Sequence, residues 1–208
     1  MKVFLDIPYC EKDEAKQLGA CWDAYNKKWY CFGENVLVKK WKMNTEPINL
    51  IGEDRHYGGS MLYIDTLPRS AWGENVRTCV EPVDWDRIKN HVYKRVDRIC
   101  EICNVDTKIS PVRIEAHERW EFNVQTNTQK LVRLVALCHW CHMVTHIGYA
   151  GGTDEYDATI EHFKKVRGFA DEQECIESDT RRVRESLLGK WDLDLSILTL
   201  NGIQTKTK

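Results

Sequence analysis

Three histidines in the middle of the chain have types and spacings that suit a catalytic metal site. His117 lies in the segment 115–122, EAHERWEF, where a strand would direct alternate side chains to one face. His142 and His146 are four positions apart, so a helix would place both rings on the same side. A neutral imidazole, with an ordinary pKa of about 6.5, can bind a transition metal or accept a proton at neutral pH. The three residues therefore indicate metal-assisted catalysis.

Four cysteines that flank His117 have the spacing of a structural zinc site. They form two Cys-x-x-Cys pairs separated by 34 residues: Cys100, Cys103, Cys138 and Cys141. Each pair can place two thiolates around a tetrahedral Zn²⁺, at Zn–S distances of about 2.3 Å. A redox dithiol would not require two matched pairs, and a chance set of buried cysteines is the remaining alternative. The other five cysteines lack such spacing and are expected to be small buried apolar groups: Cys10, Cys21, Cys31, Cys79 and Cys175.

Composition bounds the class of protein. The 208 residues are 42% hydrophobic and include eight tryptophans, enough for a packed core. There is no run of 18 apolar residues, so we expect no membrane span. The odd count of nine cysteines and the two Cys-x-x-Cys spacings favour metal binding in a reducing compartment. The N-terminus lacks the apolar segment of a signal peptide, so we expect a cytoplasmic protein. The net charge of −2 provides no overall basic field for nucleic acid, although a local basic face is compatible with it.

Composition and the positions of Pro, Asn and Gly divide the chain into three parts. These are a small α/β accessory module over 1–43, a linker over 44–61 and a larger domain over 62–208, with its core at 98–150. In the module we expect a strand, a short helix over 11–20 and an aromatic strand pair. Its PYCEKDEAKQLGACWD motif resembles a small module of unknown function found in primase-like and other mobile-element proteins. The resemblance implies a docking or stabilising appendage, with nucleic-acid binding as the alternative.

The larger domain is expected to combine helices with a hairpin, which makes the fold class α+β. Apolar residues at helical spacing predict an amphipathic helix over 83–96 with a basic outer face. Two β-rich segments predict an antiparallel hairpin that carries His117, followed by a helix from about Cys141. The other expected ranges are a strand at 62–65, hairpin strands at 112–122 and 131–138 with a loop at 123–129, helices at 154–168 and 171–191, and a terminal strand at 191–200.

The order of cysteine pair, hairpin, cysteine pair and helix resembles the HNH endonuclease family, in particular its zinc-stapled branch with a ββα-metal fold. The motifs are CEIC at 100–103, EAHERWEF at 115–122 and ALCHWCHMVTHIG at 136–148, and the likeness extends over residues 60–200. The resemblance implies that His117 is the general base. It also implies that His142 and His146 hold a divalent cation, which would be Mg²⁺, Mn²⁺, Ni²⁺ or Zn²⁺. The function implied is hydrolysis of phosphodiester bonds in DNA.

Two positions depart from the family pattern. Ala116 stands where a further ligand, Asp or His, is common before the base, and Arg133 stands where Asn is common. Glu115 could replace the ligand, because strand alternation puts it on the same face as His117, and Glu118 is the next candidate. Arg133 could contact the scissile phosphate through its guanidinium. The alternative is a degenerate site without catalysis.

Basic residues near the predicted site indicate where a phosphate backbone would bind. Arg95 and Arg98, at the end of the predicted helix, would form a phosphate-following groove with Lys130 of the hairpin. DNA is the expected partner, RNA is an alternative, and the oligomeric state stays open. The competing functions are a catalytically degenerate, zinc-stapled nucleic-acid-binding or adaptor protein, and a sensor whose ligand binds the N-terminal module.

Overall fold

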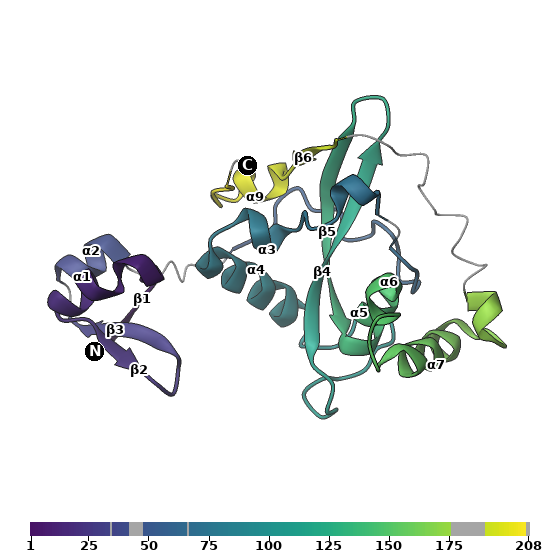
Figure 1. Cartoon of the computed structure of the whole chain (residues 1–208), viewed down its shortest axis with the longest axis horizontal. Coiled ribbons are helices and arrows are strands. Elements are labelled where there is room, and N and C mark those ends of the chain that lie inside the picture. Colours follow the sequence, from purple (N-terminus) through teal and green to yellow (C-terminus); the bar gives the residue numbers. More distant parts are fainter. Residues whose placement is uncertain (34, 42–47, 66, 176–189, 207–208) are drawn as a thin grey trace. The chain divides into compact units, whose positions relative to one another are not determined.

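The chain forms two compact units, Met1–Pro47 and Ile48–Lys208, which we call unit 1 and unit 2 (Figure 1). The computed structural model describes residues 1–33, 35–41, 48–65, 67–175 and 190–206. Both units combine helices with a small sheet, which confirms the predicted α+β class.

Unit 1 is a three-stranded antiparallel sheet that packs against two helices. The strands are β1 (Lys2–Leu5), β2 (Cys21–Asp23) and β3 (Lys28–Phe32), in the order β1-β3-β2. The helical segments are the 3-10 turn Tyr9–Glu11, α1 (Lys12–Gln17) and α2 (Val36–Trp41). Leu5 and Cys31 pack with Ala15 of α1 and Leu37 of α2, because alternate strand residues face the helices. The strands and α1 agree with the sequence pattern, whereas α2 was not predicted.

A long hairpin forms the centre of unit 2. Its strands are β4 (Ile114–Asn123) and β5 (Thr128–Cys138), and the short strand β6 (Asp192–Asp194) pairs in parallel with β5. The register shifts between Arg119 and Trp120, where one extra residue of β5 interrupts the pairing as in a β-bulge. The predicted hairpin is therefore present.

Helices pack around the hairpin. The helix α4 (Pro82–Arg95) begins with a proline, whose fixed φ and missing N–H suit the first helical position, and it packs against β4 and β5. The helix α5 (His139–Thr145) follows β5 without a loop, and α7 (Tyr156–Arg167) ends at Gly168 in a left-handed conformation. The other described helical segments are the 3-10 turn Arg69–Ala71, α3 (Val76–Cys79), α6 (Ile147–Ala150) and α9 (Ser196–Leu200).

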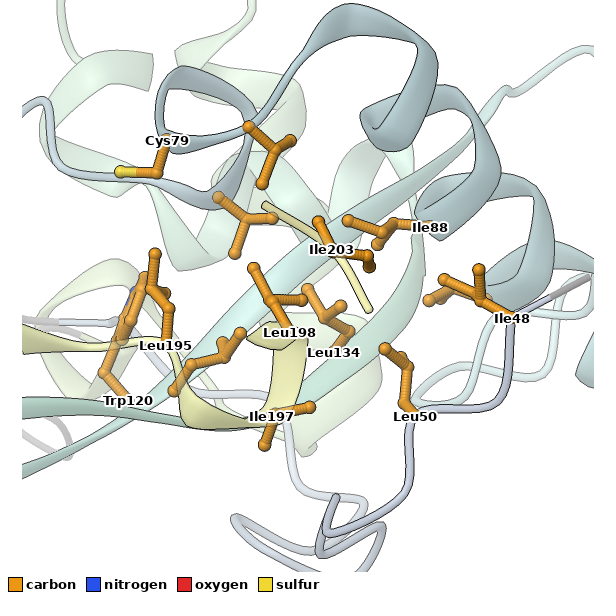
Figure 2. Close-up of a cluster of buried hydrophobic side chains, with 14 of the residues drawn as sticks. Ile48, Leu50, Cys79, Ile88, Trp120, Leu134, Leu195, Ile197, Leu198 and Ile203 are labelled. Carbon is orange, nitrogen blue, oxygen red and sulfur yellow. The ribbon is translucent and has the colours of Figure 1, made fainter. Parts of the chain in front are cut away.

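Unit 2 buries apolar side chains on both faces of the hairpin. On one face, Leu134 of β5 belongs to the same buried cluster as Ile88 of α4, Leu198 of α9 and Ile48 from the start of the unit (Figure 2). On the other face, Val135 belongs to a cluster that includes α5, α7 and the four paired cysteines. Because neighbouring residues of β5 enter different clusters, a shift of one residue in register would disrupt both.

The predicted linker over 44–61 is wrong for residues 48–61, which belong to unit 2. Ile48 and Leu50 are 4% and 8% exposed within the first apolar cluster. Glu53 accepts a hydrogen bond of 2.7 Å from the backbone N–H of Leu134. The Gly and Asn residues of this segment therefore belong to a packed loop. Residues 44–47 lie outside the described residues.

Three other predicted elements have different outcomes. Residues 191–200 form β6 and then α9, because the adjacent residues Ile197 and Leu198 are both buried and a single strand would expose one of them. Residues 62–65 form no strand. The helix predicted at 171–191 lies mostly outside the described residues. Among the residues that the structure describes, no helix has the length and apolar character needed to cross a membrane.

Candidate metal centres and active-site cleft

The hairpin and α5 determine where the candidate histidines lie. His117 is opposite Val135 in the β4–β5 register, and strand alternation directs Glu115 and His117 to the same face of β4. Strand β5 ends at Cys138 and α5 begins at the next residue, so the helix packs back against β4 directly after the strand. The two helix histidines are thereby brought to the strand histidine.

The three predicted histidines lie together in unit 2. One ring nitrogen from each of His117, His142 and His146 lies within 4.8 Å of the other two. The ring centroid of His117 is 5.3 Å from that of His142 and 4.8 Å from that of His146, and the two helix rings are 4.7 Å apart. Nitrogens at this separation can converge on one cation with little side-chain movement. This histidine cluster is a candidate metal centre.

Burial keeps the three imidazoles neutral. His117 is 3% exposed, and burial, together with the nearby charge of Arg119, lowers its pKa well below the ordinary value. Burial also lowers the pKa of His142, to about 4, and lowers that of His146. The neutral ring is the form that binds a metal or accepts a proton. At neutral pH the histidine cluster is therefore in the protonation state that either chemistry requires.

Asp65 contacts the His117 ring from a position 52 residues earlier in the chain. Its Oδ2 is 3.2 Å from Nε2 of His117, and its backbone N–H donates to the carbonyl of Thr145 at the end of α5. The other ring nitrogen of His117, Nδ1, is buried and has no hydrogen-bond partner among the described residues. Leaving a buried polar atom without a partner is costly, so this atom suits a bound water or ligand.

Glu115 connects the histidine cluster to further polar groups. Its Oε2 is 3.3 Å from Nδ1 of His142, while its Oε1 accepts from Arg113 and lies 3.1 Å from Nδ1 of His139. Burial would raise the pKa of Glu115, but its interactions with His142, Arg113 and His139 outweigh burial, and the pKa is lowered. A carboxylate beside Nδ1 of a histidine typically directs Nε2 to the metal. Glu115 is thus positioned to orient a ligand rather than to be one.

Glu118, the other predicted carboxylate ligand, lies on the opposite face of β4 from His117. Its Oε1 accepts a hydrogen bond of 2.7 Å from the backbone N–H of Val76, at the start of α3. Burial raises the pKa of Glu118 to about 7. The donor atoms within mutual reach come from the three histidines and do not include Glu118. Its contacts are those of a residue that holds α3 against the hairpin.

A cleft of about 650 Å³ opens beside the histidine cluster. His142 and His146 line it. So do three cationic residues, Arg77 from α3, Lys89 from α4 and Arg113 from the segment before β4, and three acidic residues, Asp86, Glu115 and Glu118. Guanidinium and ammonium groups bind phosphate oxygens by charge-assisted hydrogen bonds. The cleft therefore combines a candidate metal centre with groups suited to a phosphate-containing ligand.

The four paired cysteines form a second candidate metal centre. One sulfur from each of Cys100, Cys103, Cys138 and Cys141 lies within 4.8 Å of the others, and the Sγ atoms of Cys103 and Cys138 are 3.5 Å apart. Hydrogen bonds from the neighbouring thiols, that of Cys100 foremost, lower the pKa of Cys103. Four thiols in this arrangement could bind a structural metal such as zinc.

Two side chains outside the predicted set support this cysteine cluster. Glu101, within the first pair, accepts from the backbone N–H of Ala136 at 2.7 Å, and its own N–H donates to the carbonyl of the same residue. Nε2 of His162, on α7, lies 3.1 Å from Sγ of Cys141. A ring N–H directed at a thiolate is a common contact around a bound metal, and these contacts attach both pairs to the surrounding elements.

Arg133 points into the protein instead of the cleft. Its guanidinium donates to the backbone carbonyls of Tyr57 and Gly59 and pairs with Glu101 at 3.0 Å, and the residue is 5% exposed. Arg133 therefore ties a loop of unit 2 to the first cysteine pair. This structural role replaces the predicted contact with a scissile phosphate.

The three basic residues that are expected to form a phosphate-following groove do not line the cleft. Arg95 pairs with Glu53 and donates to the carbonyl of Leu134, and its side chain is 10% exposed. Arg98 and Lys130 are exposed but do not line the cleft. The cleft instead has the three cationic residues named above.

The sequence interpretation missed Asp65, Arg77 and Arg113. Strand alternation backwards from His117 through Glu115 reaches Arg113, so this residue had a usable signal. Asp65 had none, because nothing in its neighbourhood indicates that it meets a strand 52 residues away. Arg77 likewise has no spacing that relates it to the histidines.

Comparison with known proteins bears on unit 1. A family model described as "Domain of unknown function (DUF5710)" matches residues 2–41, which is 40 of the 208 residues. This match agrees with the expected N-terminal module of unknown function. No curated protein and no solved structure matches the chain. For unit 2, the HNH resemblance stays a prediction.

Proposed function

We propose that unit 2 is a metal-dependent endonuclease of the HNH kind, which hydrolyses phosphodiester bonds in DNA. The observation that carries the proposal is the cluster of His117, His142 and His146, two of whose rings line a cleft that also contains three cationic side chains. The placement of these residues on a hairpin and the following helix agrees with the resemblance. A structural Zn²⁺ bound by the four paired cysteines is part of the same proposal.

In this proposal His142 and His146 hold the catalytic cation, and Glu115 orients the His142 ring through Nδ1. Two neutral imidazoles are few protein ligands, which leaves coordination positions for substrate. A bound divalent cation would polarise a phosphoryl oxygen and stabilise the leaving oxygen. The nitrogen donors favour Zn²⁺, Ni²⁺ or Mn²⁺ over Mg²⁺.

His117 acts as the general base. It is neutral because burial lowers its pKa, and its Nδ1 has no other partner among the described residues. This nitrogen can therefore accept a proton from the attacking water. The two helix rings, 4.8 Å and 5.3 Å from the His117 ring, place the base next to the residues that hold the cation.

The three cationic side chains of the cleft bind the phosphate backbone in this proposal. Arg77 is exposed and offers a guanidinium to solvent, while Lys89 and Arg113 each pair with one carboxylate that a phosphate can displace or share. These side chains are the local contacts through which a chain with a net charge of −2 would bind nucleic acid.

The proposal is tested by cleavage of supercoiled plasmid DNA with Mg²⁺, Mn²⁺, Ni²⁺ or Zn²⁺ added in turn, and of RNA of the same sequence. We expect nicking with at least one cation, and a loss of about 100-fold or more in His117→Ala, which is the usual effect of removing a general base. The exposed His56 supplies the matched control, His56→Ala, which should cleave like the wild type.

A different outcome would favour the competing function. If the protein binds DNA in a salt-dependent manner but nicks neither nucleic acid with any of the four cations, the endonuclease proposal is wrong. The chain would then be a zinc-stapled nucleic-acid-binding protein. Circular dichroism of His117→Ala distinguishes lost chemistry from lost folding.

A further inference from the structure

We infer that Asp65 is a positioning residue for His117. The Asp65 carboxylate holds the Nε2–H of the His117 ring and thereby directs the lone pair of Nδ1 to the reacting water. The inference rests on the proposed function, because it assigns His117 the role of base. It adds a residue from outside the hairpin and helix that carry the histidine cluster. It also specifies which of the two neutral tautomers the ring adopts.

The first observation is the contact itself. Oδ2 of Asp65 lies 3.2 Å from Nε2 of His117, within the range of a hydrogen bond between a ring N–H and a carboxylate. An ionised carboxylate only accepts hydrogen bonds, so Nε2 must carry the hydrogen. A neutral imidazole has a single N–H, so Nδ1 then carries the lone pair.

The second observation is the state of Nδ1. This atom is buried and has no hydrogen-bond partner among the described residues. If the tautomer were reversed, a buried N–H would lack an acceptor and the carboxylate would face a lone pair, both of which are unfavourable. With the lone pair on Nδ1, the ring has an acceptor ready for a water proton, and Asp65 stabilises the imidazolium that forms when the proton arrives.

The third observation is that Asp65 is itself held in place. Its backbone N–H donates to the carbonyl of Thr145 at 3.0 Å, one residue before His146. The preceding residues Leu62 and Tyr63 are 0% and 6% exposed, so burial anchors the segment that carries the carboxylate. The Asp65 side chain is 17% exposed, while that of His117 is 3% exposed. A fixed carboxylate can therefore set the orientation of a ring that solvent barely reaches.

The inference is tested directly by NMR of protein labelled with ¹⁵N-histidine, with diamagnetic Mg²⁺ or Zn²⁺ added. Two-bond ¹H–¹⁵N correlations report which ring nitrogen carries the hydrogen, and the difference from His117→Ala identifies the His117 signals. We expect the Nε2–H tautomer in the wild type and in Asp65→Asn, whose amide oxygen can still accept. In Asp65→Ala we expect a mixture of tautomers. A wild-type His117 with its hydrogen on Nδ1 would overturn the inference even if the protein cleaves DNA.

Kinetics and metal titration separate positioning from metal binding. Asp65→Ala should lower kcat by about 10- to 100-fold with KM little changed, and Asp65→Asn should restore most of the rate. Asp157→Ala removes an exposed carboxylate of α7 and is the matched control. Mn²⁺ affinity should stay within a few-fold in Asp65→Ala while His142→Ala loses it. An equal loss in both variants would make Asp65 a metal ligand and contradict the inference. If no variant cleaves DNA, the proposed function fails while the NMR result still decides the role of Asp65.

Discussion

At the scale of single residues, unit 2 contains two kinds of charged side chain that the sequence pattern does not distinguish. Arg133 and Arg95 are largely buried and pair with carboxylates and backbone carbonyls, so their charges serve the fold. Arg77 is exposed on the wall of the cleft, where its charge is available to a ligand. The burial of an arginine and its hydrogen-bond partners therefore indicate, better than its residue type, whether it can contact a substrate.

Arg77→Gln should weaken DNA binding uniformly across sequences and reduce the slope of log K against log salt by about 1, because one phosphate contact is lost. Fluorescence anisotropy over a range of salt concentrations, with His117→Ala as the background, measures both effects. Arg98→Gln is the matched control, since Arg98 is exposed but does not line the cleft. An equal reduction of the slope in both variants would show that the cleft is not the binding surface.

Glu118→Gln should remove a pH dependence of stability. Burial raises the pKa of this carboxyl from 4.5 to about 7, so the folded protein retains a proton that the unfolded chain loses. The stabilisation that the protonated Glu118 provides is therefore fully present below pH 4.5 and is lost as pH rises to 7. Above pH 7 its ionisation no longer changes the free energy of unfolding. At about 1.4 kcal/mol per pKa unit, the loss amounts to about 3 kcal/mol.

Gln keeps the acceptor oxygen for the N–H of Val76 but carries no charge. We therefore expect Glu118→Gln to match the wild type near pH 4.5 and to exceed its free energy of unfolding by about 3 kcal/mol at pH 8. Urea unfolding at a series of pH values, without added divalent cation, measures the difference. A constant difference between the two proteins at all pH values would contradict the prediction.

At the scale of elements, the site depends on the direct junction between β5 and α5. The second cysteine pair is at this junction, since Cys138 ends the strand and Cys141 lies in the first turn of the helix. The histidines His142 and His146 follow on the same helix and its end. The cysteine cluster therefore holds the element that carries two of the three rings.

Removal of the metal from the cysteine cluster should lower Tm by about 10 °C or more and abolish cleavage. The reason is that a structural zinc site contributes several kcal/mol to folding, and each kcal/mol corresponds to about 2–4 °C in a protein of this size. Thermal melts with a chelator, and of Cys103→Ser, measure the effect. Cys10→Ser changes an exposed cysteine of unit 1 and should leave Tm unaltered. A chelated protein with native Tm would exclude a structural metal at this cluster.

The segment 48–61 is a further element whose importance can be measured. Glu53 pairs with Arg95 and accepts from the N–H of Leu134, and its side chain is 4% exposed. Glu53→Ala leaves the largely buried Arg95 without its carboxylate, so we expect a loss of about 3–5 kcal/mol in the free energy of unfolding. Glu121→Ala, at an exposed position of β4, should change it by less than about 0.5 kcal/mol. Similar values for both variants would indicate that 48–61 behaves as a linker after all.

At the scale of the whole molecule, the two units have separate cores. The buried cluster of unit 1 draws all its members from residues 5–41, and the two clusters of unit 2 draw theirs from 48 onwards. Both candidate metal centres and the cleft lie within unit 2. Each unit therefore contains the apolar contacts and polar groups on which its own structure depends.

Residues 48–208 produced alone should fold, retain the metal of the cysteine cluster and cleave plasmid DNA within a few-fold of the full chain. The expectation follows from the separate cores, since every member of the two apolar clusters of unit 2 comes from residue 48 onwards. Calorimetry of the full chain and of the fragment measures folding, and the plasmid assay measures activity. A fragment that aggregates, or whose melting transition falls by more than about 10 °C, would show that unit 1 stabilises unit 2.

Elements whose signals are local were predictable from the sequence. The range 83–96 differs by one residue at each end from α4, and the hairpin strands at 112–122 and 131–138 overlap most of β4 and β5. The predictions failed where burial by distant elements overrides local pattern. Residues 191–200 alternate like a strand but form α9 over part of their length, because their apolar residues enter the cluster with α4 and β5.

Both candidate metal centres could be predicted from the sequence. The order and spacing of the cysteines and histidines indicate them, because residues within one strand or helix share a face by simple periodicity. Only the tertiary structure decided which charged groups meet. Asp65 lies against His117, Arg133 against Glu101 and Arg95 against Glu53, across separations of 52, 32 and 42 residues. The periodicity of a segment describes its own faces, whereas the partner of each face depends on how all the elements pack together.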